Sequence, residues 1–361
     1  MNIIIDKNLL LAPLSKLVNI TERRSIMPIL SNILLNFSKE NVTIYSTDLE
    51  ISAISRVDYP SSVETRAVVH GRKFMEILKE MDQGEINLDF AESTLTIKQK
   101  QSEFVLSLHD PEEFPEVKEI SGAEEFSMLG SDFLEILEKV NFAVSSDETR
   151  YVLTGMYMAG SEGRVSVVGT DGFRMALCQK EVPGLNDFKG VIVPKRSIIE
   201  VGRVVSDDEV VRFLIGEKHI QFSTPSITVI SRLIEGNFPD YQNVIPKTNS
   251  NIAKIEKSKF MKGLRKVSTI ISKSEPIKVT YGDQAMEIET ESEIGRAKEV
   301  VEVSYEGELL SMNFNIRFVM DVVGHIDGDW ILVKAPSTYG AVLFVGDDEE
   351  NYKNIVMPIR V

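Results

Sequence analysis

The chain of 361 residues is 43% hydrophobic and carries a formal net charge of −15, with four histidines and one cysteine. A chain of this length can bury several cores, and its acidic balance argues against a protein that wraps nucleic acid with its whole surface. One cysteine excludes an internal disulfide, and no apolar run reaches the roughly 18 residues of a membrane span, so we expect an intracellular, cytoplasmic protein.

Taken in chain order, the hydrophobic pattern predicts the same succession of elements three times. A first helix (about 8–18, 131–143 and 258–270) precedes alternating strands, and a second helix (about 72–81, 196–205 and 317–326) is followed by strands such as EINLDF and TLTIKQ. Short strands with polar turns indicate antiparallel sheet, and two helices per repeat can cover only one face of it. We therefore predict an α+β fold of repeated domains, each with antiparallel sheet and two helices.

Short phrases of the sequence recur at a constant distance. TDLEISA at Thr47–Ala53 returns 123 residues later as TDGFRMA at Thr170–Ala176, and Lys73 and Arg196 align at the same offset. A fainter third copy places Arg317 a further 121 residues along the chain. This period is too long for a solenoid repeat and has the length of a small domain. We therefore predict three domains, at 1–122, 123–248 and 249–361.

One segment of this acidic chain is basic. Lys254–Lys273 contains seven basic residues against one acidic residue. Its apolar residues Phe260, Leu264, Val267 and Ile271 have helical spacing, which predicts an amphipathic helix with a basic polar face. Basic pairs also lie at or near predicted helix starts: Arg23 with Arg24, Arg72 with Lys73, and Lys195 with Arg196. Their recurrence indicates a phosphate-contacting surface, and ordinary solvated surface is the alternative for each pair.

Asp48 and Asp171 are the candidates for catalysis. A carboxylate could bind a metal ion or transfer protons, which leaves a carboxylate-dependent metallohydrolase as one possible class. The two residues lie in different repeats without histidine or cysteine at productive spacing, and a Thr-Asp pair after a strand is ordinary turn chemistry. The sequence also lacks a phosphate-binding glycine loop, a nucleophile elbow and a zinc signature. A non-enzymatic protein without metal or cofactor is therefore favoured.

The chain resembles the bacterial sliding clamps, the beta subunits of DNA polymerase III, over its whole length. The resemblance is carried by LLLAPLSKLV, MPILSNILL, TDLEISA, TRYVLTGM, TDGFRMA, FPDY and the terminal VMPIRV. It implies the DNA clamp fold, in which a head-to-tail homodimer forms a ring of six domains around duplex DNA without sequence specificity. The implied partners are the replicative DNA polymerase, the clamp loader and other proteins with clamp-binding motifs. The alternative is a three-domain cytoplasmic scaffold that binds proteins without encircling DNA.

Simple geometry favours two chains per ring. A module of about 120 residues has a radius of gyration of roughly 14 Å and hence a diameter of roughly 35 Å. Three touching spheres of this size leave a hole about 5 Å across and six leave about 35 Å, whereas a duplex is roughly 20 Å wide. Basic helices facing the hole would contact only phosphates, and the acidic residues would face outward.

Three sets of site residues follow. The DNA-binding set joins Arg24 and Tyr151, which match family positions, to the basic residues Arg72, Lys73, Lys195, Arg196, Lys262, Arg265 and Lys266. By resemblance, the dimer interface joins Lys73, Phe104 and Leu106 of one chain to Ile270 and Ile271 of the other. By resemblance, a peptide-binding pocket between the second and third domains uses Leu153, Thr170, Gly172, Phe173, Arg174, Met175, Pro239, Val244, Ile355, Val356, Met357, Pro358, Ile359 and Arg360.

The pocket residues have types that suit peptide binding. An apolar slot would be lined by Leu153, Met175, Val244, Ile355 and Met357. Gly172 would allow close approach of a backbone, and Thr170, Arg174 and Arg360 would be polar anchors at the rim. The alternatives are that the last strand is an edge strand with its apolar residues in the core, and that the interface residues belong to each domain's own core. Asn243, Phe173, Val152 and Asp147 depart from the family pattern.

Overall fold

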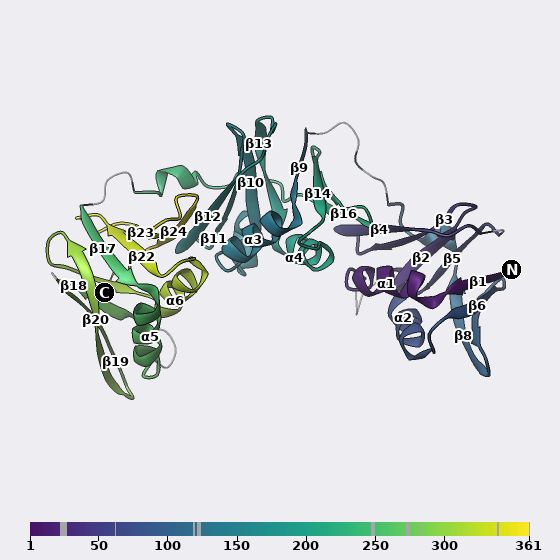
Figure 1. Cartoon of the computed structure of the whole chain (residues 1–361), viewed down its shortest axis with the longest axis horizontal. Helices are drawn as coiled ribbons and strands as arrows, with labels where there is room; N and C mark the ends of the chain where they lie inside the picture. The colour runs from purple at the N-terminus through teal and green to yellow at the C-terminus, as the bar shows by residue number, and fades with distance from the viewer. Residues whose placement is uncertain are drawn as a thin grey trace. The chain divides into compact units, whose positions relative to one another are not determined.

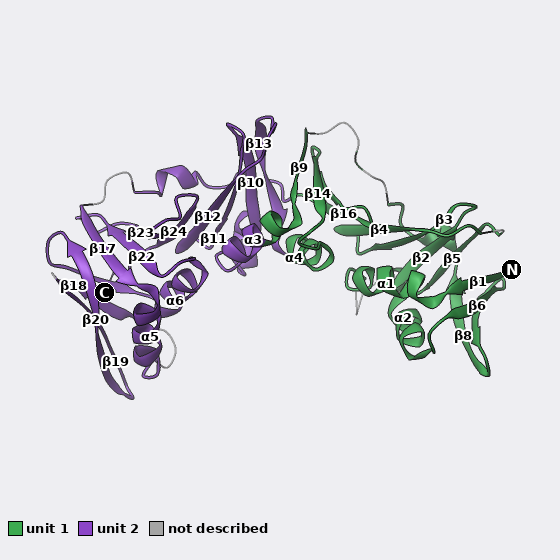
Figure 2. Cartoon of the chain, in the orientation of Figure 1, with its two compact units in different colours: residues 1–134, 196–233 green, residues 135–195, 234–361 purple. Residues whose placement is uncertain are grey.

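The computed structural model describes residues 1–21, 27–61, 63–117, 120, 124–246, 250–271, 275–282, 284–337 and 339–360. The predicted DNA contact Arg24 lies outside these residues. The chain forms two compact units, one of residues 1–134 with 196–233 and one of residues 135–195 with 234–361 (Figure 2). None of the helices in the described part of the chain is long and apolar enough to cross a membrane.

The first unit is built on a twelve-stranded sheet. Its strands, in spatial order, are β1 (Asn2–Asp6), β6 (Glu85–Phe90), β7 (Thr94–Gln99), β8 (Ser102–His109), β5 (Thr65–His70), β2 (Asn32–Phe37), β3 (Asn41–Thr47), β4 (Ile51–Asp58), β16 (Ile227–Arg232), β15 (His219–Ser223), β14 (Val210–Ile215) and β9 (Glu124–Leu129). Helices α1 (Lys7–Leu17) and α2 (Gly71–Glu80) contact each other, and both contact strands of this sheet (Figure 1).

The second unit contains the other twelve-stranded sheet. Its strands, in spatial order, are β13 (Phe188–Pro194), β10 (Gly155–Ser161), β11 (Arg164–Thr170), β12 (Arg174–Glu181), β24 (Tyr352–Val356), β23 (Val342–Gly346), β22 (Trp330–Ala335), β17 (Asn251–Glu256), β20 (Gly295–Glu306), β19 (Ala285–Ser292), β18 (Ile277–Tyr281) and β21 (Leu310–Phe314). Helices α5 (Lys257–Ser268) and α6 (Ile316–His325) contact each other, and α5 packs against β19 and β20. The predicted α+β class with antiparallel sheet is confirmed.

Each sheet crosses from one sequence repeat into the next. In the first unit β4 pairs antiparallel with β16, with Ser52 opposite Ile230. In the second unit β12 pairs antiparallel with β24, with Met175 opposite Ile355. The strands of the second repeat are therefore shared between the two sheets, which is why the compact units divide that repeat rather than follow the predicted domain boundaries.

The helices begin one residue earlier than the sequence pattern predicts. The remaining two are α3 (Gly130–Asn141) and α4 (Lys195–Val204), and short 3₁₀ turns lie at Pro28–Ser31, Pro111–Glu113, Glu148–Leu153 and Tyr241–Asn243. The last residue before a helix caps it in three cases: Asp6 Oδ1 accepts from the Asn8 N–H, Asn315 Oδ1 accepts from the Arg317 N–H, and the His70 ring accepts from the Lys73 N–H. A cap fixes where the first turn starts, so each of these helices follows its cap directly.

Helix α5 corrects one part of the predicted apolar stripe. Phe260, Leu264 and Val267 are fully buried, as their spacing predicts. The helix ends at Ser268, however, so Ile271 lies beyond it and is only half-buried. Cys178 is buried and unpaired, and burial raises the pKa of its thiol to about 11, which keeps the thiol protonated at neutral pH.

Candidate functional site

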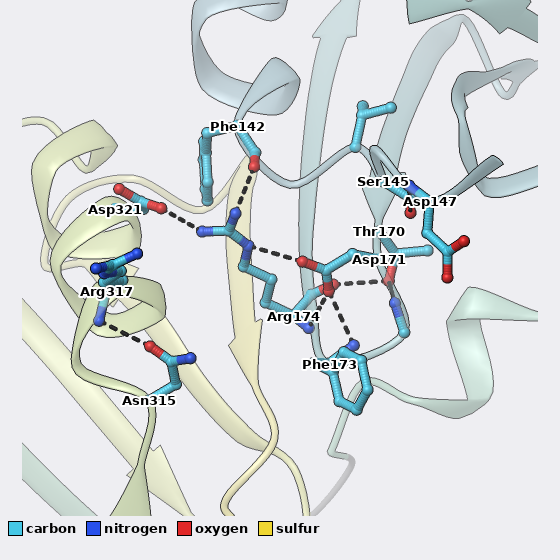
Figure 3. Close-up of polar contacts among 12 residues, drawn as sticks. Phe142, Ser145, Asp147, Thr170, Asp171, Phe173, Arg174, Asn315, Arg317 and Asp321 are labelled. Atoms are coloured by element: carbon cyan, nitrogen blue, oxygen red, sulfur yellow. Dashed lines mark hydrogen bonds and ion pairs between the residues drawn. The ribbon is translucent and has the colours of Figure 1, made fainter. Parts of the chain in front are cut away.

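The TDGFR segment forms a tight turn between β11 and β12. The Thr170 hydroxyl donates to the Arg174 carbonyl over 2.6 Å and accepts from the Gly172 N–H over 3.0 Å. Asp171 Oδ1 accepts from the N–H groups of Phe173 and Arg174, at 2.9 and 3.0 Å (Figure 3). Gly172 has a φ of 86°, in the left-handed region that glycine adopts without steric cost. The side chains of this motif therefore build the turn.

The first repeat contains the same turn. The Thr47 hydroxyl accepts from the Leu49 N–H over 3.0 Å, and Asp48 Oδ1 accepts from the N–H groups of Glu50 and Ile51, at 3.0 and 2.7 Å. Leu49 has a φ of 77°, which matches Gly172. Both aspartates thus have the turn role that the sequence favours over catalysis.

Arg174 lies at the junction between the second and third repeats. Its side chain is 13% exposed. Nε donates to Asp171 Oδ2 over 3.0 Å, Nη2 donates to the Phe142 carbonyl over 2.8 Å, and Nη1 pairs with Asp321 of α6 (Figure 3). With each guanidinium nitrogen engaged, Arg174 orders the turn against α6, and its role as a polar anchor for a peptide stays a prediction. The Thr170 hydroxyl is likewise bonded within the turn, and its role as a polar anchor also stays a prediction.

Of the predicted slot residues, Leu153, Met175 and Ile355 are buried, Met357 is half-buried and Val244 is exposed. The apolar residues of the whole predicted pocket divide in the same way. Leu153, Met175, Ile355 and Val356 are buried, so they belong to the core beneath the surface. Phe173, Val244 and Ile359 are exposed to 53%, 41% and 37%. The surface near the turn is therefore apolar and open, and Phe173 is further covered on one side by the Arg150 guanidinium, 5.2 Å from its ring centre.

The C-terminal segment runs alongside this turn. The Met357 N–H donates to the Phe173 carbonyl over 2.8 Å, and the Ile359 N–H donates to the Asn313 carbonyl over 2.7 Å. The Arg360 guanidinium lies over the Tyr339 ring at 4.6 Å, and the Tyr339 hydroxyl donates to the Pro358 carbonyl. β24 lies between β12 and β23, so the alternative of a final edge strand is wrong, although Ile355 and Val356 are core residues.

A buried apolar cluster lies below this surface, where the second and third repeats meet. Its members are Val168, Met175, Leu177, Leu343, Val345 and Ile355. Three residues of the connector, the segment between β16 and β17, pack against the cluster: Phe238, Tyr241 and Ile245. Tyr157 also packs there, and its ring stacks on Phe238 at 5.0 Å. The sequence did not predict this aromatic packing, because it joins Tyr157 of β10 to Phe238, far away along the chain. Pro239 lies exposed on this connector.

A second cluster, also missed from sequence, joins the repeats through Lys139 of α3. Its ammonium pairs with Glu135 and Asp327 at 2.9 Å each and with Glu349, and its side chain is only 8% exposed. Burial by itself would lower the pKa of Lys139, but hydrogen bonds to Glu349, Asp327 and Glu135 raise it well above its ordinary value. The three carboxylates lie close enough to hold a cation. Lys139 contacts all three and supplies that positive charge.

Several charges of the basic segment, which comprises the end of β17 and helix α5, are neutralised within the chain. Lys254 pairs with Asp347, Lys259 with Glu256 and Glu302, and Lys266 with Glu299. Lys257 donates to the Ile326 carbonyl. Lys262 and Arg265 are exposed, and within the described residues neither has an ion pair. Lys273 lies outside the described residues.

The other predicted DNA contacts occupy differing environments. Arg72 is half-buried, and Lys73 is exposed and pairs with Glu76 at 2.8 Å. Lys195 is half-buried; its ammonium donates to the Val144 carbonyl over 3.3 Å, and desolvation and then the Arg174 charge lower its pKa. Tyr151 is 58% exposed.

Arg196 connects the first two repeats. Its guanidinium lies 2.6 Å from Oδ2 of Asp48, a carboxylate that is almost fully buried in the first TD turn. Half of the Arg196 side chain remains exposed. Since Arg174 pairs with Asp321 at the other junction, each TD turn uses an ion pair to bind a helix of the following repeat.

The predicted interface residues lie at the surface. Phe104 on β8 is 38% exposed, and Leu106, Ile270 and Ile271 are half-buried. The Ser292 hydroxyl at the end of β19 donates to the Ile270 carbonyl over 2.8 Å. The Ile270–Ile271 segment is therefore attached to the β19–β20 hairpin.

The chain is similar to proteins of one family along its full length. Models of three successive domains of the DNA polymerase III beta subunit match in order: the N-terminal domain at 1–118, the central domain at 128–240 and the C-terminal domain at 242–360. The beta sliding clamp of Pseudomonas putida is 31% identical over 369 residues, with all of both chains covered.

Solved structures agree with this likeness. The DNA polymerase III subunit beta of Pseudomonas aeruginosa is 28% identical with a TM-score of 0.96, and all of both chains are covered. A sliding clamp of the same organism bound to griselimycin is 29% identical with a TM-score of 0.95, again with full coverage.

Proposed function

Because the chain belongs to the family of DNA polymerase III beta subunits, it is a DNA sliding clamp, and we propose that two copies close head to tail into a ring around duplex DNA. The observation that carries the proposal is the match of three successive clamp domains in order along residues 1–360. Family membership favours this function over a scaffold that does not encircle DNA. A ring of this kind would tether the replicative polymerase in the cytoplasm and would require no catalytic role of Asp171.

The strand pairing within the chain supports a specific way of closing the ring. At both internal junctions, the strand that follows the hairpin turn of one repeat pairs with the last strand of the next repeat: β4 with β16, and β12 with β24. The third repeat's equivalent of β4 is β20, and the first repeat's equivalent of β16 is β8. If the same kind of junction forms between two chains, β20 of one chain therefore pairs with β8 of the other.

Both strands have a backbone edge available for this pairing. β8 pairs with β7 along Ser102–Ser107, whereas β5 pairs only with Leu108 and His109. β20 pairs with β19 along Gly295–Glu302, whereas β17 pairs only with Val303–Glu306. In the described part of the chain, the remaining edge of each strand has no ladder partner, and such edges favour strand addition.

Apolar side chains accompany these two edges. Phe104 and Val105 on β8 are exposed to 38% and 58%, and Val300 on β20 is exposed to 54%. An obligate interface buries residues of this kind at its centre. We therefore propose β8 and β20, with Lys73, Leu106, Ile270 and Ile271 beside them, as the dimer interface.

The exposed cations support a sequence-independent contact with DNA. Lys262 and Arg265 on α5 are the residues of the basic segment best suited to phosphate, since their charges are not compensated within the described residues. The exposed Tyr151 could pack along the backbone. Lys195 is less suited to contact phosphate, because its ammonium donates to the Val144 carbonyl.

The open apolar surface near the TDGFR turn supports binding of client peptides. Phe173, Val244 and Ile359 would contact apolar side chains of an extended segment from the polymerase, the clamp loader or another client. Arg360 at the end of the C-terminal segment is exposed and could anchor a polar group. The buried cluster below, with Met175 and Ile355, would form the floor.

The client surface can be tested without disturbing the core. Val244→Asp introduces a charge at an exposed apolar position. Deletion of Met357–Val361 removes the C-terminal segment that runs alongside the TDGFR turn. Both should weaken binding of a clamp-binding peptide at least tenfold in fluorescence polarisation while leaving a dimer. Val210→Asp is the matched control, because Val210 is an exposed valine on β14, and it should bind the peptide normally. Undiminished binding by both test variants would place the pocket elsewhere.

The clamp function itself is tested by topology. We expect protein assembled on a nicked circular plasmid by the clamp loader to remain bound through gel filtration in high salt. Linearising the plasmid should release it within minutes, because a closed ring slides off an end. Equal retention on circular and linear DNA would mean that the protein binds DNA by affinity, and would contradict encirclement.

A further inference from the structure

Two lysines, Lys334 and Lys353, lie on the face of the second unit's sheet that carries the buried apolar cluster of Met175 and Ile355. On β24, Tyr352 points toward α3, where its hydroxyl donates to the Lys139 carbonyl, while Ile355 belongs to the apolar cluster on the other face. Side chains alternate along a strand, so Lys353 shares the face of Ile355. It lies opposite Leu177 on β12, which is also a cluster residue.

Lys334 reaches the same face from a neighbouring strand. On β22, Leu332 packs against the cluster, and Lys334 lies two residues further along. Its register partner on β23 is Leu343, which lies opposite Ile355. β23 separates the strands of the two lysines, and Lys353 lies two residues along β24 from Ile355, so the two backbones are about 12 Å apart. Both long side chains can still reach the surface above Leu343.

Both lysines are half-buried, and within the described residues neither ammonium has an ion pair or a hydrogen bond. Two other lysines of this unit are compensated, since Lys254 pairs with Asp347 and Lys298 with Glu287. A cation on a partly desolvated apolar surface gains most from an anion that arrives with a partner.

We infer that Lys334 and Lys353 select client peptides that carry an acidic side chain next to their apolar anchors. The inference rests on the proposed function, because it assigns a specificity to the same client surface. An extended segment that contacts Phe173 and Val244 would continue over Leu343, where a carboxylate can meet both ammonium groups. The apolar residues of the peptide supply contact area, and the lysines choose between peptides of equal apolarity.

A peptide fits these lysines better than nucleic acid does. Phosphate contacts require clustered cations, whereas here two cations flank six buried apolar residues. The same face also carries Glu256, opposite Trp330, and Asp347, which pairs with Lys254, so the charge of this face is mixed and not uniformly positive. A single carboxylate among apolar side chains matches this mixture of apolar surface and isolated charge.

The test compares two synthetic peptides that differ at one side chain, which ends in a carboxylate in one peptide and in an amide in the other. Each has leucine and phenylalanine anchors, and the position between them is glutamate in one and glutamine in the other. The full-length dimer should bind the glutamate peptide about three- to tenfold more tightly at low salt, and this preference should shrink at 0.5 M salt. The variant K334M/K353M should lose the preference while binding the glutamine peptide within about twofold of the parent.

Two controls separate charge from packing. K334R/K353R should keep the preference, because the positive charges remain. K278M removes an exposed lysine from the more distant β18 and should bind both peptides as the parent does.

The possible failures are distinguishable. If the parent binds neither peptide, the client surface itself is misplaced. If it binds both equally, or if K334M/K353M keeps the preference, the client surface can stand but the inference is overturned. If K334M/K353M keeps the preference and instead loses retention on circular DNA, the two lysines contact phosphates, which also overturns the inference.

Discussion

At the scale of single residues, the two TD turns have the same backbone but different residues in the left-handed position. Gly172 has a φ of 86°, and a side chain there would also meet Arg150 Nη1 at 2.8 Å. Gly172→Ala should therefore destabilise the protein by about 1–2 kcal/mol. Leu49 has a φ of 77° and is 53% exposed, so Leu49→Gly should relieve strain and gain about 0.5 kcal/mol after the added chain entropy.

Thermal melting followed by circular dichroism can measure both changes. The two substitutions should shift the melting temperature in opposite directions, with the larger shift for Gly172→Ala. Equal destabilisation by the two variants would show that the left-handed backbone of Leu49 carries no strain that glycine could relieve.

At the scale of elements, the sequence predicted the bounds of the helices closely but did not predict the strand pairs that join the repeats. The six helices lie within two residues of their predicted bounds, because periodicity and caps such as Asp6 and Asn315 are local signals. The pairing of β12 with β24 joins residues far apart in sequence, so no local pattern reports it. For the same reason the sequence did not predict the partners of Arg174, since Phe142 and Asp321 come from distant elements.

The Lys139 cluster is the element-scale feature with the clearest energetic consequence. Lys139→Met leaves Glu135, Asp327 and Glu349 close together without their cation, which should cost about 3–5 kcal/mol at pH 7. Burial by itself would raise the pKa of Glu135, but hydrogen bonds from Lys180 and Lys139 lower it in the parent. Stability from this lowered pKa is present above the carboxylate's ordinary pKa and is lost as the pH falls through the folded value.

The difference between Lys139→Met and the parent should therefore shrink as the pH falls from 7 to 4, since the crowded carboxylates of the variant take up protons. The raised pKa of Lys139 means that its own contribution persists below its ordinary pKa and is lost only as the pH rises through the higher folded value. Urea unfolding at several pH values measures the difference. Lys278→Met, at an exposed lysine, should change stability by less than about 0.5 kcal/mol at any of them. A constant penalty for Lys139→Met from pH 7 to pH 4 would indicate lost packing and not uncompensated charge.

At the scale of the whole molecule, closure of the proposed ring would use the edges of β8 and β20 that have no ladder partner within the described residues. If β8 of one chain adds to β20 of another, Phe104 and Val300 lie at the centre of a contact that repeats the internal junctions. Phe104→Asp or Val300→Asp should then give a folded monomer of 40.5 kDa, where the parent is a dimer of two such chains. A desolvated charge without a partner costs several kcal/mol and would weaken association by two orders of magnitude or more. Light scattering at sub-micromolar concentration measures the mass, circular dichroism verifies the fold, and Val210→Asp should remain dimeric. An equimolar mixture of Phe104→Asp with Val300→Lys provides the decisive arm, because one of its joints would bring opposite charges together and recover part of the dimer. Dimers that persist in both single variants would show that closure uses surfaces other than these strands.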